Sequence, residues 1–239
     1  MAGFPGGTAV SLVAVYDWPA SDGQAGGSPH LHTASTEGYV VTGGAGAVET
    51  LSADGYRRHG LERGTVLWFT PGTVHRLIND SGDLEVTVVM QNAGIPESGD
   101  AVFTFPEDIL ADPGAYGAAA SAPAAPGLSE DERGEAARTR RDLAVEGYLE
   151  LREKVEADGA EAMRPLWERA AALVSGRTGV WRKLWEAGPK AQAEATGEHL
   201  TALAGGDWAH LCGAHVSDGG GSARKWGMCG RLETWDLRP

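Results

Sequence analysis

The sequence predicts a mostly β fold with helices: a closed β-barrel or sandwich, then a helical region that ends in a β-hairpin. Three observations indicate this. Short apolar runs separated by Gly, Pro and Asp turns fill the first 110 residues, the composition changes sharply after residue 127, and six of the eight tryptophans lie after residue 160. We therefore expect a barrel over residues 1–112, a linker over 113–127 and a folded helical region over 128–239.

The first half contains a series of short predicted strands. The first strand lies within residues 8–18 and is followed by a loop rich in Gly, Ser and Asp. Asp54-Gly55, between two β-type runs, is a strong hairpin signal. The other expected strands cover residues 47–51, 56–61, 66–69, 75–79 and 84–91. Strands this short and this closely spaced are typical of a barrel or sandwich.

The second half carries helix signals. Ser129 followed by Glu132 is a capping box, and Gly159 is expected to end the helix that it opens. Pro165 suits the first turn of a second helix, which Gly176 should end. Two further helices, around residues 181–185 and 195–203, carry apolar stripes. We expect those stripes, and the tryptophans of this half, to be buried.

The charge distribution excludes several classes of partner. The chain has a formal net charge of -13, and residues 1–112 hold 4 basic and 14 acidic residues and no lysine. Such a surface repels nucleic acid and anionic lipid. No basic leader and no apolar run long enough for a membrane span are present. We expect a cytoplasmic protein with a small-molecule ligand, and a tail that packs on the barrel or on the second subunit of a homodimer.

Four residues of the first half form a pattern suited to a metal. His30 and His32 are two residues apart and therefore point the same way on a strand, Glu37 begins the β-rich run after them, and His75 follows a Pro-Gly turn. Three imidazoles and one carboxylate are ligands for a divalent first-row metal.

These residues resemble the two motifs of the cupin family. The first motif, G-x5-H-x-H-x4-E-x6-G, matches at His30, His32, Glu37 and Gly44, with Gln24 at the leading glycine. The second motif, G-x5-P-x-G-x2-H-x3-N, matches at Gly64, Gly72, His75 and Asn79, with Thr70 at the proline position and Pro71 one residue later.

The resemblance covers about residues 8–110. It implies an antiparallel cupin barrel of the jelly-roll type and one divalent transition metal, which could be Fe, Mn, Ni, Zn, Co or Cu. The implied metal ligands are His30, His32, Glu37 and His75. Such a metal usually keeps an open position for water or substrate.

The candidates for the substrate pocket lie beside the predicted ligands. They are Tyr39, Trp68, Leu77 and Met90. In the strand at 84–91, the pattern allows either Val86, Val88 and Met90 or the alternating set to face inward. Most of the four arginines of this half are expected in solvent.

The favoured function is a metal-dependent enzyme that acts on a small organic molecule, an oxidoreductase of the dioxygenase type. Apolar candidate linings and few bases suit a metal that itself binds O2. A metal-dependent isomerase of a sugar or sugar phosphate is an alternative, although a phosphate needs cationic partners. A non-catalytic small-molecule-binding cupin is a second alternative. Glu37 is the catalytic candidate, as ligand or general base.

Two cysteines and two histidines near the end of the chain permit several interpretations. A hairpin with its loop centred on Gly220 and Gly221 would place Cys212 opposite Cys229. With His210 and His215, these thiols could form a zinc site. A regular hairpin, however, points His215 to the other face, so a disulfide and two free thiols also stay open.

Overall fold

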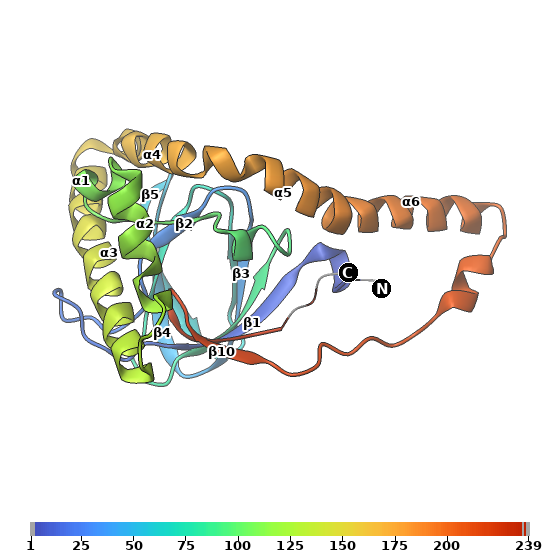
Figure 1. Ribbon diagram of the computed structural model, residues 1–239, viewed down its shortest axis with the longest axis horizontal. Helices are drawn as coiled ribbons and strands as arrows, with labels where there is room; N and C mark the ends of the chain where they lie inside the picture. Colours follow the sequence, from blue (N-terminus) through green and yellow to red (C-terminus); the bar gives the residue numbers. More distant parts are fainter. Residues whose placement is uncertain (1–2, 236, 238–239) are drawn as a thin grey trace.

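The computed structural model describes residues 3–235 and residue 237, and its strands form a jelly-roll-like barrel of two sheets (Figure 1). One sheet has six strands in the order β10-β11-β1-β8-β3-β6, and the other has five in the order β5-β4-β7-β2-β9. The predicted fold class, a jelly-roll-type barrel with a helical region and terminal strands, is confirmed. The outer limits of the two predicted domains, residues 1 and 239, lie outside the described residues.

The strands have the following bounds. They are β1 (Ala9–Val15), β2 (His30–His32), β3 (Glu37–Gly43), β4 (Ala45–Ser52), β5 (Gly55–Glu62), β6 (Val66–Phe69), β7 (Val74–Ile78), β8 (Glu85–Met90), β9 (Ala101–Phe103), β10 (Ala223–Trp226) and β11 (Gly230–Thr234).

The alternation of side chains along β8 decides what fills the barrel. Val86, Val88 and Met90 are buried, whereas Thr87 and Val89 are partly exposed. The sequence pattern alone allows both sets. The pairing of β8 with β1 on one side and β3 on the other places the first set inside, because a strand held between two neighbours has only one face toward the core.

The predicted hairpin between β4 and β5 is confirmed. Ser52 pairs with Gly55, so Ala53 and Asp54 form a two-residue loop. Gly55 has a φ of 78°, a left-handed conformation that glycine adopts without a steric penalty.

The helices cover the five-stranded sheet and then extend away from it (Figure 1). The α-helices are α1 (Glu107–Leu110), α2 (Pro113–Ser121), α3 (Glu130–Asp158), α4 (Arg164–Val174), α5 (Thr178–Trp185) and α6 (Ala191–Ala204). The short helices are η1 (Pro5–Gly7), η2 (Pro96–Ser98), η3 (Ala122–Ala124), η4 (Ala160–Met163), η5 (Ser175–Arg177), the π-helical η6 (Glu186–Lys190) and η7 (Ala209–Gly213).

The long helix α3 begins and ends where the sequence predicts. The Ser129 hydroxyl accepts a hydrogen bond from the Glu132 amide (3.3 Å), the Ser129 amide donates to the Glu132 carboxylate (2.8 Å), and Gly159 forms the C-cap. Gly147 allows close packing on the sheet, because a Cβ there would lie 2.2 Å from the Thr104 carbonyl oxygen.

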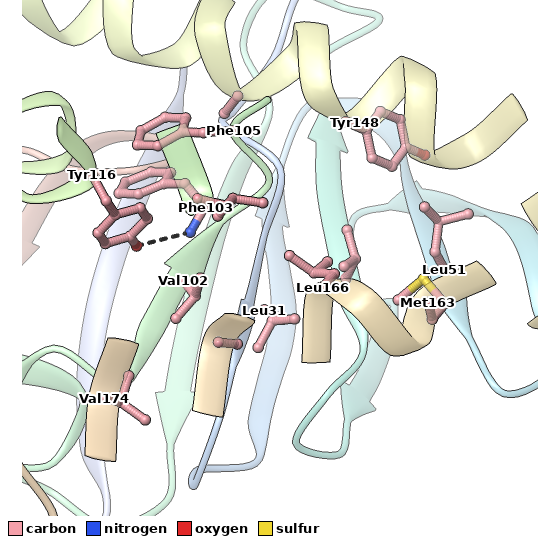
Figure 2. Close-up of a cluster of buried hydrophobic side chains, with 14 of the residues drawn as sticks. Leu31, Leu51, Val102, Phe103, Phe105, Tyr116, Tyr148, Met163, Leu166 and Val174 are labelled. Atoms are coloured by element: carbon pink, nitrogen blue, oxygen red, sulfur yellow. Dashed lines mark hydrogen bonds between the residues drawn. The ribbon is translucent and has the colours of Figure 1, made fainter. Parts of the chain in front are cut away.

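A hydrophobic core lies between these helices and the five-stranded sheet (Figure 2). Phe105 and Tyr148 are among its most buried members, and burying a side chain of this size stabilises the fold by about 1.5–3 kcal/mol. Other members from the sheet and the helices are Leu31, Leu51, Val102, Phe103, Tyr116, Met163, Leu166 and Val174.

Residues 113–121 form helix α2 instead of the expected linker. Asp112 caps this helix by accepting hydrogen bonds from the Gly114 and Ala115 amides. Tyr116 is buried in the core, where its hydroxyl oxygen accepts a hydrogen bond from the Phe103 amide at 3.2 Å (Figure 2). The Ala-rich composition therefore belongs to a small-residue helix that lies close to the sheet. The division of the chain at residues 112 and 127 stays a prediction.

Helix α6 departs from the expectation that its apolar stripe is buried. It extends past the barrel in Figure 1, and none of its residues is buried. Leu200 is 64% exposed, and Trp208, which follows the helix, is also 64% exposed. The stripe lacks a packing partner because α6 leaves the barrel after its first turns, where Gln192 donates to the Phe4 carbonyl and accepts from the Gly7 amide.

The terminal hairpin is shorter than predicted and its turn lies elsewhere. β10 and β11 pair with Ala223 opposite Thr234, so the turn falls at residues 227–229 and not at Gly220-Gly221. β11 also pairs with β1, which adds the hairpin to the six-stranded sheet of the barrel. A pattern of local turn residues does not reveal this pairing between the two halves of the chain.

A polar cluster beneath the helices is centred on the buried carboxylate of Glu49. The Glu49 carboxylate accepts hydrogen bonds from the Tyr56 hydroxyl (3.0 Å), Arg58 (3.1 Å) and the Tyr148 hydroxyl (3.1 Å). Arg152 lies 3.9 Å from the same carboxylate. We call these five residues the Glu49 cluster.

Most arginines of the barrel segment lie in solvent, as expected, and Arg76 is the exception. It is fully buried and forms a two-pronged ion pair with Asp22, at 2.6 and 3.1 Å, whereas Arg57, Arg58 and Arg63 are exposed. Arg76 alternates with inward His75 and Leu77 on β7, so its side chain lies under the helices on the other face of the sheet.

No helix in the part of the chain that the structure describes is both long and apolar enough to cross a membrane.

Candidate metal centre

Four buried side chains from three strands converge inside the barrel. β2 carries His30 and His32, β3 begins at Glu37, and β7 carries His75 directly opposite His30 in the register. The Pro-Gly turn before β7 contributes to this arrangement, because the Gly72 amide donates to the His32 carbonyl at 2.9 Å. The two sequence motifs therefore contact each other through their side chains and through a backbone hydrogen bond.

The facing atoms lie at distances that suit a shared cation. One nitrogen or oxygen from each of the four residues lies within 4.8 Å of the others. His75 Nε2 is 3.1 Å from His30 Nε2 and 2.8 Å from Glu37 Oε2, which is 3.3 Å from His32 Nε2. Two ligand atoms each about 2.1 Å from one ion, at right angles to each other, are about 3 Å apart.

Backbone carbonyls fix the orientation of two imidazoles. His30 Nδ1 lies 2.9 Å from the Ser28 carbonyl oxygen, and His75 Nδ1 lies 3.2 Å from that of Thr73. A carbonyl oxygen only accepts hydrogen bonds, so each Nδ1 carries the proton of the neutral ring. Each Nε2 then offers its lone pair to the centre of the cluster, as in metal-ligating histidines.

Asp100 orients the third imidazole. This fully buried carboxylate lies 2.7 Å from His32 Nδ1. A carboxylate behind a histidine is a common partner of metal ligands, since it fixes the ring and raises its basicity. Sequence reasoning missed Asp100, because it precedes β9 far from both motifs and only the β2–β9 pairing brings it to His32.

The electrostatics of the cluster favour a cation. Burial lowers the pKa of His30 well below its usual value and keeps that ring neutral. Burial alone would also lower the pKa of His32, but Glu37 and Asp100 raise it to about 10. Burial would raise the pKa of Glu37, but the His75 and His32 imidazoles hold it well below its usual range. The buried Glu37 thus stays ionised.

These residues pass a test of fit for a divalent metal. Glu37 Oε2 is buried and has no hydrogen-bond partner among the described residues. Its near neighbours, His30 Nε2 and His75 Nε2, are electron-pair donors in the neutral rings described above. Three such atoms facing one another without a proton between them are unfavourable unless a cation lies among them.

A cavity of about 490 Å³ opens from the cluster. His30, His32 and Glu37 line it at its buried end. Three of the predicted pocket residues, Tyr39, Leu77 and Met90, also line it. The hydroxyl of Tyr39 is buried and has no hydrogen-bond partner among the described residues, so it is available to a bound molecule.

Trp68 does not belong to this cavity. Its side chain is 69% exposed, whereas the next residue on β6, Phe69, is buried and stacks on His75 with ring centres 4.7 Å apart. The prediction of Trp68 as a pocket residue is wrong, because successive side chains of a strand point to opposite faces and that of Trp68 points outward.

The terminal hairpin supplies a wall that sequence reasoning missed. Lys225, Met228, Cys229 and Leu232 line the cavity together with residues of β1, β3 and β8, which belong to the same sheet. Residues 1–112 contain no lysine, but Lys225 of the terminal hairpin lines the cavity of the barrel. The sequence analysis predicts a terminal hairpin but not its pairing with β1, which brings the hairpin to the cavity.

The cysteine and histidine group of the tail does not form a site in the described residues. Cys212 lies exposed in η7, whereas Cys229 is buried in the cavity wall, and both thiols are free. The pairing of Cys212 with Cys229 is therefore wrong, because the hairpin turn lies at 227–229. His210 instead stacks on His199, with ring centres 4.4 Å apart. The described residues hold one metal-type cluster, that of His30, His32, Glu37 and His75.

Comparison with known proteins supports the resemblance seen in the motifs. The model of the cupin domain family matches residues 21–90, a range that contains all four cluster residues. No curated protein matches the chain.

Several solved structures are similar to part of the chain. KdgF from Halomonas sp. is 24% identical, with 28% of this chain and 57% of that chain covered and a TM-score of 0.25. The WlaRB TDP-quinovose 3,4-ketoisomerase from Campylobacter jejuni is 16% identical (34% and 60% covered, TM-score 0.30). An uncharacterised double-stranded β-helix protein from Klebsiella pneumoniae is 18% identical (35% and 66% covered, TM-score 0.28). The chain thus spans less than two thirds of each of these structures.

Proposed function

We propose that the cupin domain at residues 21–90 forms the metal centre of an enzyme that acts on a small organic molecule. The observation that carries this proposal is the convergence of three imidazole nitrogens and an unpaired, buried carboxylate oxygen at the inner end of a cavity. A purely structural cluster would pair its polar atoms with one another. Here the open side faces a space large enough for a small molecule.

His30, His32, Glu37 and His75 would hold one divalent transition metal, consistent with their donor atoms. Such a metal supplies Lewis acidity and, when redox-active, a site for O2. Asp100 keeps His32 in place, and the Ser28 and Thr73 carbonyls do the same for His30 and His75.

The other cavity residues divide into one polar group and an apolar wall. The Tyr39 hydroxyl can donate a hydrogen bond to an oxygen of the substrate, and burial and the neighbouring Glu37 raise the pKa of this phenol so that it stays protonated. Leu77, Val88 and Met90 exclude water from the space beside the cluster. Burial also raises the pKa of the Cys229 thiol, which disfavours a thiolate nucleophile.

The favoured reaction is an O2-dependent oxidation. Near the cluster, the described lining offers a carboxylate ligand, one phenol and one protonated thiol, so it is poor in bases that could move protons between substrate carbons. The alternative, an isomerisation, needs such a base, and Glu37 is the group that would serve. The second alternative is a protein that binds a small molecule without turnover.

Metal analysis combined with oxygen uptake tests the proposal. Protein purified without a metal-binding tag should contain about one transition metal per chain, and a panel of small carboxylic acids and sugars should include compounds that cause O2 consumption. The His30→Ala/His75→Ala variant serves as the blank. A metal-loaded protein that consumes no O2 but interconverts isomers would favour the isomerase. A protein that binds a ligand without turnover would favour the binding protein. A folded protein that takes up no metal would contradict the proposal.

A further inference from the structure

The walls of the cavity define the chemistry of the molecule that fits it. Between the buried cluster and the solvent, the lining is apolar and consists mainly of Val13, Leu77, Val88, Met90, Met228 and Leu232. Apart from the cluster residues, two charged side chains from the described part of the chain line the cavity, Glu97 and Lys225, and both are exposed. The cavity therefore has a metal-type end, an apolar middle and a charged end near solvent.

The two charges at the outer end differ in what they already bind. The Glu97 carboxylate accepts a hydrogen bond from the Gly94 amide at 2.7 Å, in the loop that precedes η2. Lys225 forms no ion pair with any described carboxylate. The ammonium group is thus the charge that a ligand would meet.

The strand pairing fixes the side of the hairpin on which Lys225 lies. It pairs with Leu232, whose side chain packs in the barrel core, and Ala223, two residues earlier, also lines the cavity. Arg224 pairs with Glu233 and does not line the cavity. Side chains alternate along a strand, so this placement of Lys225 follows from the fold and not from one rotamer.

We infer that the substrate is a small amphipathic anion, with an apolar body in the cavity and one carboxylate or phosphate group at Lys225. This inference rests on the proposed function for the role of the inner end, where the reacting part of the substrate would meet the metal ligands. It corrects the view that the barrel lacks a lysine for an anionic substrate, since the terminal hairpin provides one.

The test compares probes that share an eight-carbon chain and differ in charge: octanoate, octyl phosphate, 1-octanol and octylammonium. Their dissociation constants are measured by calorimetry at low salt on the full chain. We expect octanoate or octyl phosphate to bind about fivefold more tightly than octanol, the range of an exposed ion pair. Whichever of the two anions binds more tightly identifies the group as carboxylate or phosphate.

Variants of one strand provide the controls. Lys225→Gln should abolish the advantage of the anions and leave octanol binding unchanged, Lys225→Arg should keep the advantage, and Arg224→Gln should have no effect. An unchanged anion preference in Lys225→Gln, a preference for octylammonium, or failure of octanol and both anions to bind would each overturn the inference.

The metal-free protein separates this inference from the proposed function. The anion preference is expected with and without metal, since Lys225 does not belong to the cluster. A protein that holds no metal but prefers anions through Lys225 would refute the proposed function alone. A protein that holds metal and shows no role for Lys225 would refute this inference alone.

Discussion

Glu37 and Glu49 are both buried carboxylates of the barrel, but their neighbours differ in kind. Glu49 accepts hydrogen bonds from two tyrosine hydroxyls and an arginine, all of which are donors. Glu37 faces the Nε2 atoms of imidazoles, and the Nδ1 protons of His30 and His75 are turned away from it, toward the Ser28 and Thr73 carbonyls. A carboxylate surrounded by donors stabilises the fold, whereas one surrounded by other electron-pair donors requires a ligand.

The two faces of the five-stranded sheet differ in the same way in the partners of their polar side chains. His75 and Arg76 are neighbours on β7, yet one belongs to the metal-type cluster and the other to the ion pair with Asp22 under the helices. The face toward the cavity has an unpaired carboxylate oxygen and an unpaired phenol, at Glu37 and Tyr39. The face toward the helices uses its charges to fix α3 on the sheet, through Tyr148 and Arg152.

The largest expected effect is loss of metal from the His30→Ala/His75→Ala variant. Removal of two of four ligands should lower the metal content, measured by elemental analysis, from about one per chain to near zero. The variant should keep its far-ultraviolet circular dichroism, because the removed rings leave the Glu49 cluster intact. Full metal occupancy in this folded variant would refute the ligand assignment.

Glu37→Gln should lower turnover by at least about 100-fold, since it removes the charge of a ligand or base while it keeps the size. Thermal unfolding should change less than in Glu49→Gln, because Glu37 lies among imidazoles and not among tyrosine and arginine donors. The measurement is the rate of O2 consumption with a substrate from the panel. Glu85→Gln, on the exposed start of β8, is the matched control. Undiminished turnover would show that Glu37 is neither an essential ligand nor a base.

Glu49→Gln should lower the stability of the fold and not the metal content, the reverse of what we expect for the metal-site variants. An amide cannot accept from three donors as a carboxylate does, so we expect a loss of on the order of 2–3 kcal/mol in the free energy of unfolding, measured with urea. Metal content should stay at the wild-type level. Glu62→Gln, on the exposed end of β5, should leave stability unchanged. A fall in metal content with unchanged stability would reverse the roles given to the two carboxylates.

The smallest expected effect is a change in the stability of the fold at acidic pH. Burial would raise the pKa of Asp22, but the ion pair with Arg76 lowers it from 3.8 to about 2. A folded-state pKa below the unfolded value means that the pair stabilises the fold above about pH 4, and that this contribution disappears as the pH falls toward 2. The difference in urea stability between wild type and Asp22→Asn should therefore shrink over this range. A difference that stays constant from pH 6 to pH 2 would contradict the role of the pair.

The sequence predicts the parts of the molecule that depend on local spacing. His30 and His32 share a face because strands alternate, and Ser129 with Glu132 caps α3 because the two residues are one turn apart. The Asp54-Gly55 hairpin is equally local. Such patterns need no knowledge of the remainder of the chain.

The missed parts depend on contacts between distant segments. Trp68 and Phe69 are both apolar, and only the pairing of β6 with β3 decides which one faces His75. The sequence places an apolar stripe in both α4 and α6, but residues of α4 are buried against the core and none of α6 is buried. Lys225 and Asp100 enter the site through β11–β1 and β2–β9 pairings that no local pattern encodes.

The pairing of Ser11 with Thr234 sets an order for biosynthesis. β1 leaves the ribosome long before β11 has been made. The edge of β1 that pairs with β11 therefore stays unpaired while more than 200 residues are added. The four cluster residues all lie between residues 30 and 75 and can come together early. The wall that contains Lys225 arrives only with the terminal hairpin. In a nascent chain, the four cluster residues can thus come together before the cavity beside them is complete.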